Sequence, residues 1–261
     1  TFDGQGYTLS NLYLSEYAPG DEYKASDHYG RALFGYCKGA TVRNLTVTGS
    51  VETNNHYASG VVGYAQNNSL IENCHNKANV TCTGTGLQWG LAGVVGYLYN
   101  STAKNCSNTG VIHGVNGQVG GIVGLASSTV HIEGCANTGE VVVTDKYNSY
   151  LGGGGIVGCV SGTAELLNCY NTGNVQSTVP GNYAGGIVGY NTGTLTVQKC
   201  YSTGSITDFG TLGGILGGSK GGTATIGQSY YLEDSAPDAN ANGASKLPAE
   251  QMHAKDFALG L

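Results

Sequence analysis

Short apolar pairs enclosed by small residues recur along the whole chain. Six of them have the form Gly-x-x-Gly with Val, Ile or Leu at both inner positions, and Ala32-Leu33-Phe34-Gly35 is an earlier variant. The closing glycines are Gly35, Gly63, Gly96, Gly124, Gly158, Gly189 and Gly217, which are separated by 28, 33, 28, 34, 31 and 28 residues. Such regular self-similarity predicts seven copies of one structural unit.

A second motif follows five of these glycines. Ten or eleven residues after each comes a cysteine, namely Cys74, Cys106, Cys135, Cys169 and Cys200. The best copies continue as Cys-x-Asn-Thr-Gly-x-Val, as in Cys169 to Val175. Each unit therefore holds three short pieces rich in Val, Ile, Thr and Tyr, separated by Gly and Asn. These are strand and turn signals, and no stretch before residue 246 shows a sustained helical period.

A unit this small buries its apolar side chains only against stacked copies of itself. The pattern therefore predicts an all-β fold, a three-sided parallel β-helix of about seven coils. Equivalent residues then lie above one another at the parallel-strand spacing of about 4.8 Å. We expect the five repeat cysteines to form one inward column. The asparagines two residues after a cysteine, at 76, 108, 137 and 171, are expected to form a side-chain ladder that satisfies backbone groups at a turn.

The ends of the chain differ from the repeats. Residues 1–30 are expected to form a first coil and a cap, with an alternating strand at 8–14 and an acidic stretch from Glu16 to Asp27. Residues 31–232 form the predicted solenoid. Residues 233–261 read as a linker and a short C-terminal helix, which covers the last coil or leads into another domain.

Charge and composition exclude several function classes. The formal net charge is −6, and the 11 Lys and Arg residues do not cluster, so a nucleic-acid partner is not expected. No apolar run is long enough to enter a membrane, and residues 1 to 20 lack the pattern of a signal peptide. Because 45 of 261 residues are glycine while 40% are hydrophobic, the chain has a core to bury and many turns. We interpret it as an excised piece of a longer protein.

The eight cysteines predict neither a metal nor a cofactor site. Five occupy one repeat position, and no Cys-x-x-Cys or matched His pair occurs. Free cysteine packs readily as a small buried residue, so a buried thiol column is favoured. Cys37, Cys82 and Cys159 lie at other repeat positions, and a disulfide among them is left open.

The chain resembles GLUG repeats. The resemblance rests on Gly-Gly-Ile-Val-Gly-Tyr at 185–190, on Asn-Cys-Tyr-Asn-Thr-Gly-Asn-Val at 168–175 and on the opening Thr-Phe-Asp-Gly-Gln-Gly-Tyr. It implies a bacterial extracellular protein, often a cell-surface adhesin, in which the repeats form a β-helix stalk. Some proteins with such repeats are zinc-dependent IgA1 peptidases, whose His-Glu-x-x-His signature is absent here. The resemblance therefore implies architecture and location and no catalytic residue.

Aromatic residues suggest a binding strip for surface glycans or proteins. An aromatic stands six to eight residues before the closing glycine in six units, and the candidate strip comprises Tyr57, Trp89, Tyr150 and Tyr183. Such rings either pack a corner of the coil or offer a flat surface to a sugar.

Two alternatives to an adhesive or structural module stay open. One is a polysaccharide-degrading enzyme, because Glu72 and Glu133 stand two residues before a cysteine and two coils apart. The other is ice binding, because Thr109, Thr138, Thr172 and Thr203 align. We favour the non-enzymatic module.

Overall fold

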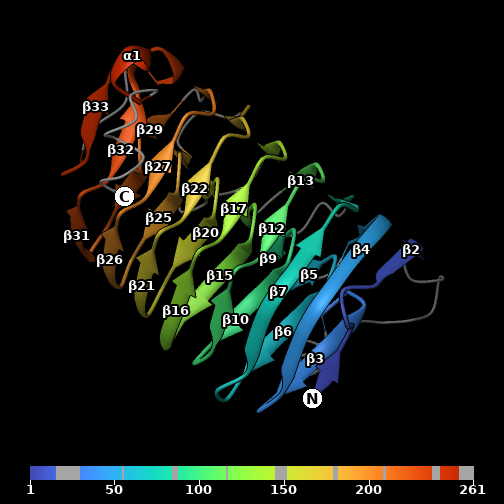
Figure 1. Ribbon diagram of the computed structural model, residues 1–261. Helices are drawn as coiled ribbons and strands as arrows, with labels where there is room; N and C mark the ends of the chain where they lie inside the picture. Colours follow the sequence, from blue (N-terminus) through green and yellow to red (C-terminus); the bar gives the residue numbers. More distant parts are fainter. Residues whose placement is uncertain are drawn as a thin grey trace.

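The computed structural model describes residues 1–15, 30–54, 56–83, 88–115, 117–144, 152–178, 182–207, 210–236 and 242–252. In these residues the chain winds into a parallel β-solenoid whose coils follow one another from the N-terminal to the C-terminal end (Figure 1). Every strand pairing joins parallel strands from successive coils, as the repeat predicted. The acidic stretch predicted to act as a cap lies outside the described residues.

Three parallel sheets run along the solenoid. Sheet B contains β3 (Phe34–Lys38), β6 (Val62–Gln66), β10 (Val95–Tyr99), β15 (Val123–Ser127), β20 (Val157–Val160), β25 (Val188–Asn191) and β30 (Leu216–Ser219). Sheet C contains β5 (Ala58–Ser59), β9 (Gln88–Ala92), β14 (Gly117–Gly120), β19 (Gly152–Gly154), β24 (Tyr183–Gly185) and β29 (Thr211–Gly213). The seven predicted units thus give seven strands in sheet B but about six complete turns among the described residues.

Sheet A contains the most strands. Each coil contributes up to three consecutive strand segments to it, which we call the first, second and third legs. The first leg comprises β1 (Phe2–Asp3), β7 (Leu70–Asn76), β11 (Thr102–Lys104), β16 (Thr129–Glu133), β21 (Thr163–Leu167), β26 (Thr194–Gln198) and β31 (Thr223–Gly227). The second comprises β12 (Ser107–Asn108), β17 (Ala136–Asn137), β22 (Tyr170–Asn171), β27 (Tyr201–Ser202), β32 (Tyr230–Leu232) and β33 (Ser245–Leu247). The third comprises β8 (Asn79–Cys82), β13 (Ile112–Gly114), β18 (Val141–Val143), β23 (Val175–Ser177) and β28 (Ile206–Thr207). Three longer strands cross more than one leg: β4 (Thr41–Thr53) spans all three, β7 continues into the second, and β2 (Thr8–Leu14) spans the second and third.

The bend between the first two legs is made by one residue with a left-handed backbone. In successive coils this residue is Asn44, Asn73, Asn105, Gly134, Asn168, Lys199 and Gln228, with φ between 48° and 62°. Asparagine and glycine tolerate this conformation best, which explains their predominance. Because the bend interrupts the strand alternation, Ile71 before it and Cys74 after it both face the core.

The interior is divided into two apolar columns. The larger lies between sheet B and the first leg of sheet A and includes Val95, Val123, Ile132 and the repeat cysteines. The smaller lies between the third leg and sheet C and includes Val80, Ile112 and Val141.

A buried asparagine ladder fills the waist between the two columns. Asn76 Nδ2 donates to Asn108 Oδ1, Asn108 Nδ2 to Asn137 Oδ1, and Asn137 Nδ2 to Asn171 Oδ1, each at 2.8 Å. Each of these amides also donates to the carbonyl oxygen two residues later, as Asn137 does to Gly139 at 2.8 Å. The predicted ladder is therefore confirmed, and it satisfies the backbone where the chain turns.

In four Gly-x-x-Gly motifs, those that begin at Gly60, Gly93, Gly121 and Gly155, the first glycine leaves room for an asparagine of this ladder, whereas Gly186 faces Ser202 and Gly214 faces the Tyr231 ring. A Cβ atom placed on Gly121 would lie 2.4 Å from Asn137 Cγ and 2.2 Å from the Gly155 carbonyl oxygen. The closing glycine has a second reason, since a Cβ atom on Gly124 would lie 2.4 Å from the Leu91 nitrogen of sheet C. The first glycine therefore lets the backbone lie directly against the ladder, and the closing glycine lets sheet B lie directly against sheet C.

All eight cysteines are buried as thiols. The five repeat cysteines are at most 1% exposed and form the predicted inward column. Cys37 lies in the larger column, Cys82 in the smaller one, and Cys159 in a separate small cluster with Leu125 and Tyr190. The disulfide that the sequence left open is therefore not formed. Burial raises the pKa of Cys159 to about 12, and a hydrogen bond with Cys106 together with burial raises the pKa of Cys74.

We expect a thiol-specific disulfide reagent to modify none of the eight cysteines of the native protein at pH 8, and all eight after unfolding in denaturant. Burial blocks the reagent and disfavours the reactive thiolate. Rapid native modification of several thiols would contradict the buried column.

The raised pKa of Cys159 predicts a loss of stability at alkaline pH. The stability that this protonated thiol contributes is complete below about pH 9 and is lost as the pH rises from 9 to 12. Cys159→Ala should remove that part of the alkaline loss.

The C-terminal part closes the stack more fully than the sequence indicated. After the 3-10 helix η1 (Glu233–Ser235), strand β33 adds to sheet A by pairing with β32. The predicted C-terminal helix is present as α1 (Ala249–Met252), and the residues after 252 lie outside the described part of the chain.

Candidate functional site

A polar hollow lies at the corner where the chain passes from sheet B to sheet A. We call it the corner hollow, and its volume is about 350 Å³. It is lined by Asn68, Ser69, Leu70, Asn100, Ser101, Thr102, Thr129 and His131. These residues come from three successive coils, so the hollow is a product of the stacking.

The corner hollow lies where the corner of the middle coil is one residue shorter than the corners on either side of it. Gln66, Tyr99 and Ser127 are register partners in sheet B, while Leu70, Thr102 and His131 are partners in sheet A. Three residues therefore connect the two sheets in the coils before and after, whereas Asn100 and Ser101 alone make the connection in the middle coil.

Hydrogen bonds hold the lining of the corner hollow in place. Asn100 Nδ2 donates to Asn68 Oδ1 at 3.3 Å, and the Ser69 nitrogen donates to Ser101 Oγ at 3.1 Å. Ser101 Oγ donates in turn to the Tyr99 carbonyl at 2.9 Å. His131 Nδ1 lies 3.1 Å from Glu165 Oε2, and both side chains are largely exposed. The site can thus offer amide, hydroxyl and imidazole groups to a ligand.

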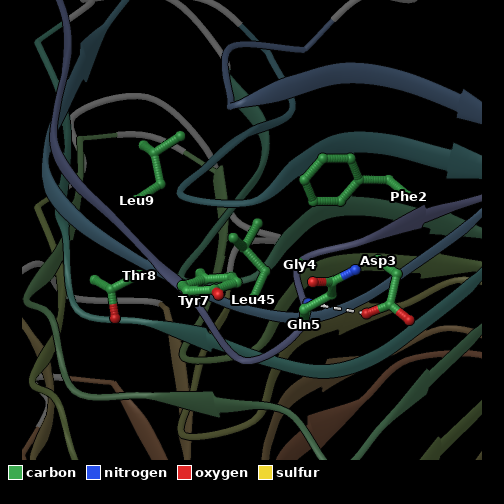
Figure 2. Close-up of a pocket in the computed structure, with 8 residues that line it drawn as sticks. All are labelled: Phe2, Asp3, Gly4, Gln5, Tyr7, Thr8, Leu9 and Leu45. Atoms are coloured by element: carbon green, nitrogen blue, oxygen red, sulfur yellow. Dashed lines mark hydrogen bonds between the residues drawn. The ribbon is translucent and has the colours of Figure 1, made fainter.

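A second hollow lies at the N-terminal end of the solenoid (Figure 2). It has a volume of about 360 Å³ and is lined by Phe2, Asp3, Gly4, Gln5, Tyr7, Thr8, Leu9 and Leu45. Figure 2 shows the Gln5 nitrogen bonded to Asp3, whose pKa is lowered by hydrogen bonds from Asn44 and Gln5. Phe2, Tyr7 and Leu9 are exposed there, so this hollow is mainly apolar.

The candidate aromatic strip does not form one column in the structure. Strand β9 pairs with β5 so that Leu91 faces Ala58, which places Gly90, and not Trp89, at the position of Tyr57. In the same column Gly152 pairs with Tyr183, and Tyr150 lies outside the described residues. Counting six to eight residues before a glycine mixes the two faces of a strand, because side chains alternate from one face to the other.

Tyr57 and Tyr183 instead pack against the outer side of sheet B. The Tyr57 ring stacks on Tyr97 with centroids 4.8 Å apart and lies 5.6 Å from the Tyr64 centroid. Tyr183 stacks on the buried Tyr190 at 4.6 Å. These two rings of the strip therefore take part in packing at the junction of sheets B and C.

Trp89 remains on the surface with 44% of its area exposed. Its backbone nitrogen donates to His56 Nδ1 at 2.9 Å, and its carbonyl accepts from the Tyr57 nitrogen at 2.7 Å. Burial lowers the pKa of His56. Among the described residues, Trp89 is the exposed member of the predicted strip, whereas Tyr57 and Tyr183 are half-buried.

We expect Trp89→Ala to change the free energy of unfolding by less than about 1 kcal/mol, because the ring is exposed. Tyr97→Ala should cost about 2–3 kcal/mol, because the Tyr97 ring stacks on both Tyr57 and Tyr64. Urea denaturation followed by circular dichroism measures both. Equal losses for the two variants would contradict the division between surface and packing rings.

A further tyrosine column, which the aromatic pattern did not predict, lies on the second leg of sheet A. Tyr170 and Tyr201 stack on adjacent coils with centroids 5.2 Å apart and ring planes 5° apart, and Tyr230 is the register partner of Tyr201. The signal was the residue directly after each of two repeat cysteines, in Cys169-Tyr170 and Cys200-Tyr201.

Glu72 and Glu133 do not face each other across a free gap. Lys104 is the register partner of both and lies between them, and its Nζ is 2.9 Å from Glu133 Oε2. This hydrogen bond raises the pKa of Lys104. Arg43 pairs in register with Glu72 and is 2.9 Å from Asp3. The carboxylates thus belong to a surface ladder of alternating charge.

The threonine column considered for ice binding is present as a single file. Thr109, Thr138 and Thr172 are exposed, whereas Thr203 is half-buried. Within the described residues, no group of three or more His, Cys, Asp or Glu side chains is arranged to hold a metal ion.

Comparison with known proteins agrees with this geometry. A model of the GLUG motif matches residues 54–81 and 180–207. The chain contains GLUG motifs. Each matched segment follows one coil from sheet C through sheet B and across sheet A, so one GLUG motif corresponds to one turn of the solenoid. No curated protein matches the chain significantly in sequence.

The solenoid also has a counterpart among solved structures. It is similar to the crystal structure of "a putative immunoglobulin A1 protease from Bacteroides ovatus", with a TM-score of 0.62 and 20% sequence identity. The match covers 97% of this chain and 70% of that chain. The likeness shows the fold. No helix among the described residues is long and apolar enough to cross a membrane.

Proposed function

We propose that this chain is a non-enzymatic, extracellular module of a bacterial cell-surface protein, and that it serves as a stalk or an adhesion domain. The observation that carries the proposal is the continuous asparagine ladder, which runs through four coils from Asn76 to Asn171 in the waist of the solenoid. A satisfied buried network makes the coils rigid and fixes their register. Rigidity along the axis is what a stalk needs.

The charge ladder supports the non-enzymatic part of the proposal. A hydrolase that uses two carboxylates needs one of them protonated and both facing the substrate. Lys104 lies in register between Glu72 and Glu133, pairs with Glu133 at 2.9 Å and occupies the space that a substrate would need between the two carboxylates. The pair is therefore better suited to hold coils together than to cleave a polysaccharide.

The location is tested with an antibody raised against the purified domain. We expect it to label intact, non-permeabilised cells of the bacterium that encodes the chain, and a protease added outside the cells should remove the signal. Labelling only after permeabilisation would contradict an extracellular module.

The enzymatic alternative is tested separately. The purified domain should leave IgA1 and a panel of bacterial and plant polysaccharides uncleaved after prolonged incubation. Cleavage that is lost in both Glu72→Gln and Glu133→Gln would overturn the non-enzymatic assignment.

A further inference from the structure

We propose that the corner hollow is a binding site for one pyranose ring of a neutral saccharide. The site is formed by Asn68, Asn100, Thr102, Thr129 and His131 around the short corner of the middle coil. This proposal goes beyond the stalk function and holds whatever the location of the protein.

The size of the hollow sets the size of the ligand. Pockets for small molecules span about 300–1,000 Å³, so about 350 Å³ lies at the lower end of the range. That is enough for one ring and not for an extended oligosaccharide. Because the hollow is open to solvent on one side, further sugar units of a chain can project away from the protein.

The chemistry of the lining sets the class of ligand. Each asparagine amide carries both donors and acceptors, and each threonine or serine hydroxyl both donates and accepts. Sugar hydroxyls have the same dual character and therefore find a partner in either orientation. Leu70 adds an apolar surface, against which the C–H groups of a sugar ring can pack.

The charges around the hollow favour a neutral ligand. His131 is the one ionisable residue of the lining, and it already pairs with Glu165 at 3.1 Å. Lys104, two residues after Thr102, pairs with Glu133 at 2.9 Å. A charged ligand would have to compete with these ion pairs, whereas a neutral one does not.

Two serines of the lining are fixed before a ligand arrives. Ser69 and Ser101 are at most 4% exposed, and their hydrogen bonds tie the corner to the backbone of two coils. A preorganised site loses little side-chain entropy on binding, which compensates for the small contact area.

Saturation-transfer NMR tests the proposal with the methyl pyranosides of glucose, galactose, mannose, fucose and N-acetylglucosamine as probes. The proteins compared are the unmodified chain, Thr129→Trp and Thr194→Trp. Thr129 lines the hollow, and Thr194 is exposed in the same column two coils further along. Circular dichroism confirms that each variant is folded.

We expect at least one pyranoside to bind the unmodified chain, Thr129→Trp to weaken that binding by about tenfold or more, and Thr194→Trp to change it by less than about twofold. If Thr129→Trp does not fold, one glycine inserted after Asn100 gives this corner the three-residue length of its two neighbours and should abolish binding. The proposal is overturned if none of the five probes binds, or if both tryptophan variants bind as well as the unmodified chain.

Discussion

Val123→Asp is expected to unfold several coils of the solenoid. Val123 is fully buried in the larger apolar column, where its register partners are Val95 and Val157. An unpaired carboxylate at that position costs several kcal/mol, a large part of the 5–15 kcal/mol that stabilises a typical domain. We expect the free energy of unfolding to fall by about 4 kcal/mol or more, measured by guanidinium denaturation with far-UV circular dichroism.

Two control variants separate charge from shape in this experiment. Val123→Thr keeps the shape and should cost about 1–3 kcal/mol for its buried hydroxyl. Thr138→Asp introduces the same carboxylate on an exposed position and should change stability by at most about 0.5 kcal/mol. A Val123→Asp protein as stable as Thr138→Asp would show that position 123 is not in the core.

Asn137→Leu is expected to have the second largest effect. The side chain of Asn137 makes three hydrogen bonds of 2.8 Å, to Asn108, Asn171 and the Gly139 carbonyl. Leucine has a similar size but leaves those three groups without their partner, and each such loss costs about 1–3 kcal/mol. Some of this cost is offset by burial of the leucine, so we expect a net loss of about 3–6 kcal/mol.

Urea denaturation measures the loss, with Thr138→Ala as the neighbouring control. Thr138 is exposed, so its replacement should change stability by at most about 0.5 kcal/mol. An Asn137→Leu protein that is as stable as the control would mean that the ladder contributes nothing to stability.

The repeat made the interior predictable from the sequence. A residue type that returns at one position in successive units, such as Cys135 and Cys169 or Asn137 and Asn171, must form a column once the coils stack in register. Its orientation followed from chemistry, because free thiols pack inward and amides satisfy turns. The glycines were also expected at turns, although their contact with the asparagine ladder was not foreseen.

The surface was less predictable because it depends on register to the single residue. The strip failed as a column since Trp89 is one residue out of phase with Tyr57, and a strand turns such a shift into the opposite face. The shorter corner at Asn100 and Ser101, where the corner hollow lies, has no motif of its own. By contrast, Lys104 stands two residues before Cys106, so the charge between Glu72 and Glu133 was visible in the sequence.

Hydrogen exchange of the asparagine side chains tests the central claim most directly. In a native NMR spectrum, the side-chain amide protons of Asn76, Asn108, Asn137 and Asn171 should exchange with solvent only when coils open, because all four side chains are fully buried and bonded in series. Asn105, which is exposed, should exchange within seconds. Exchange of all five at the same rapid rate would contradict a solenoid held together by a buried ladder.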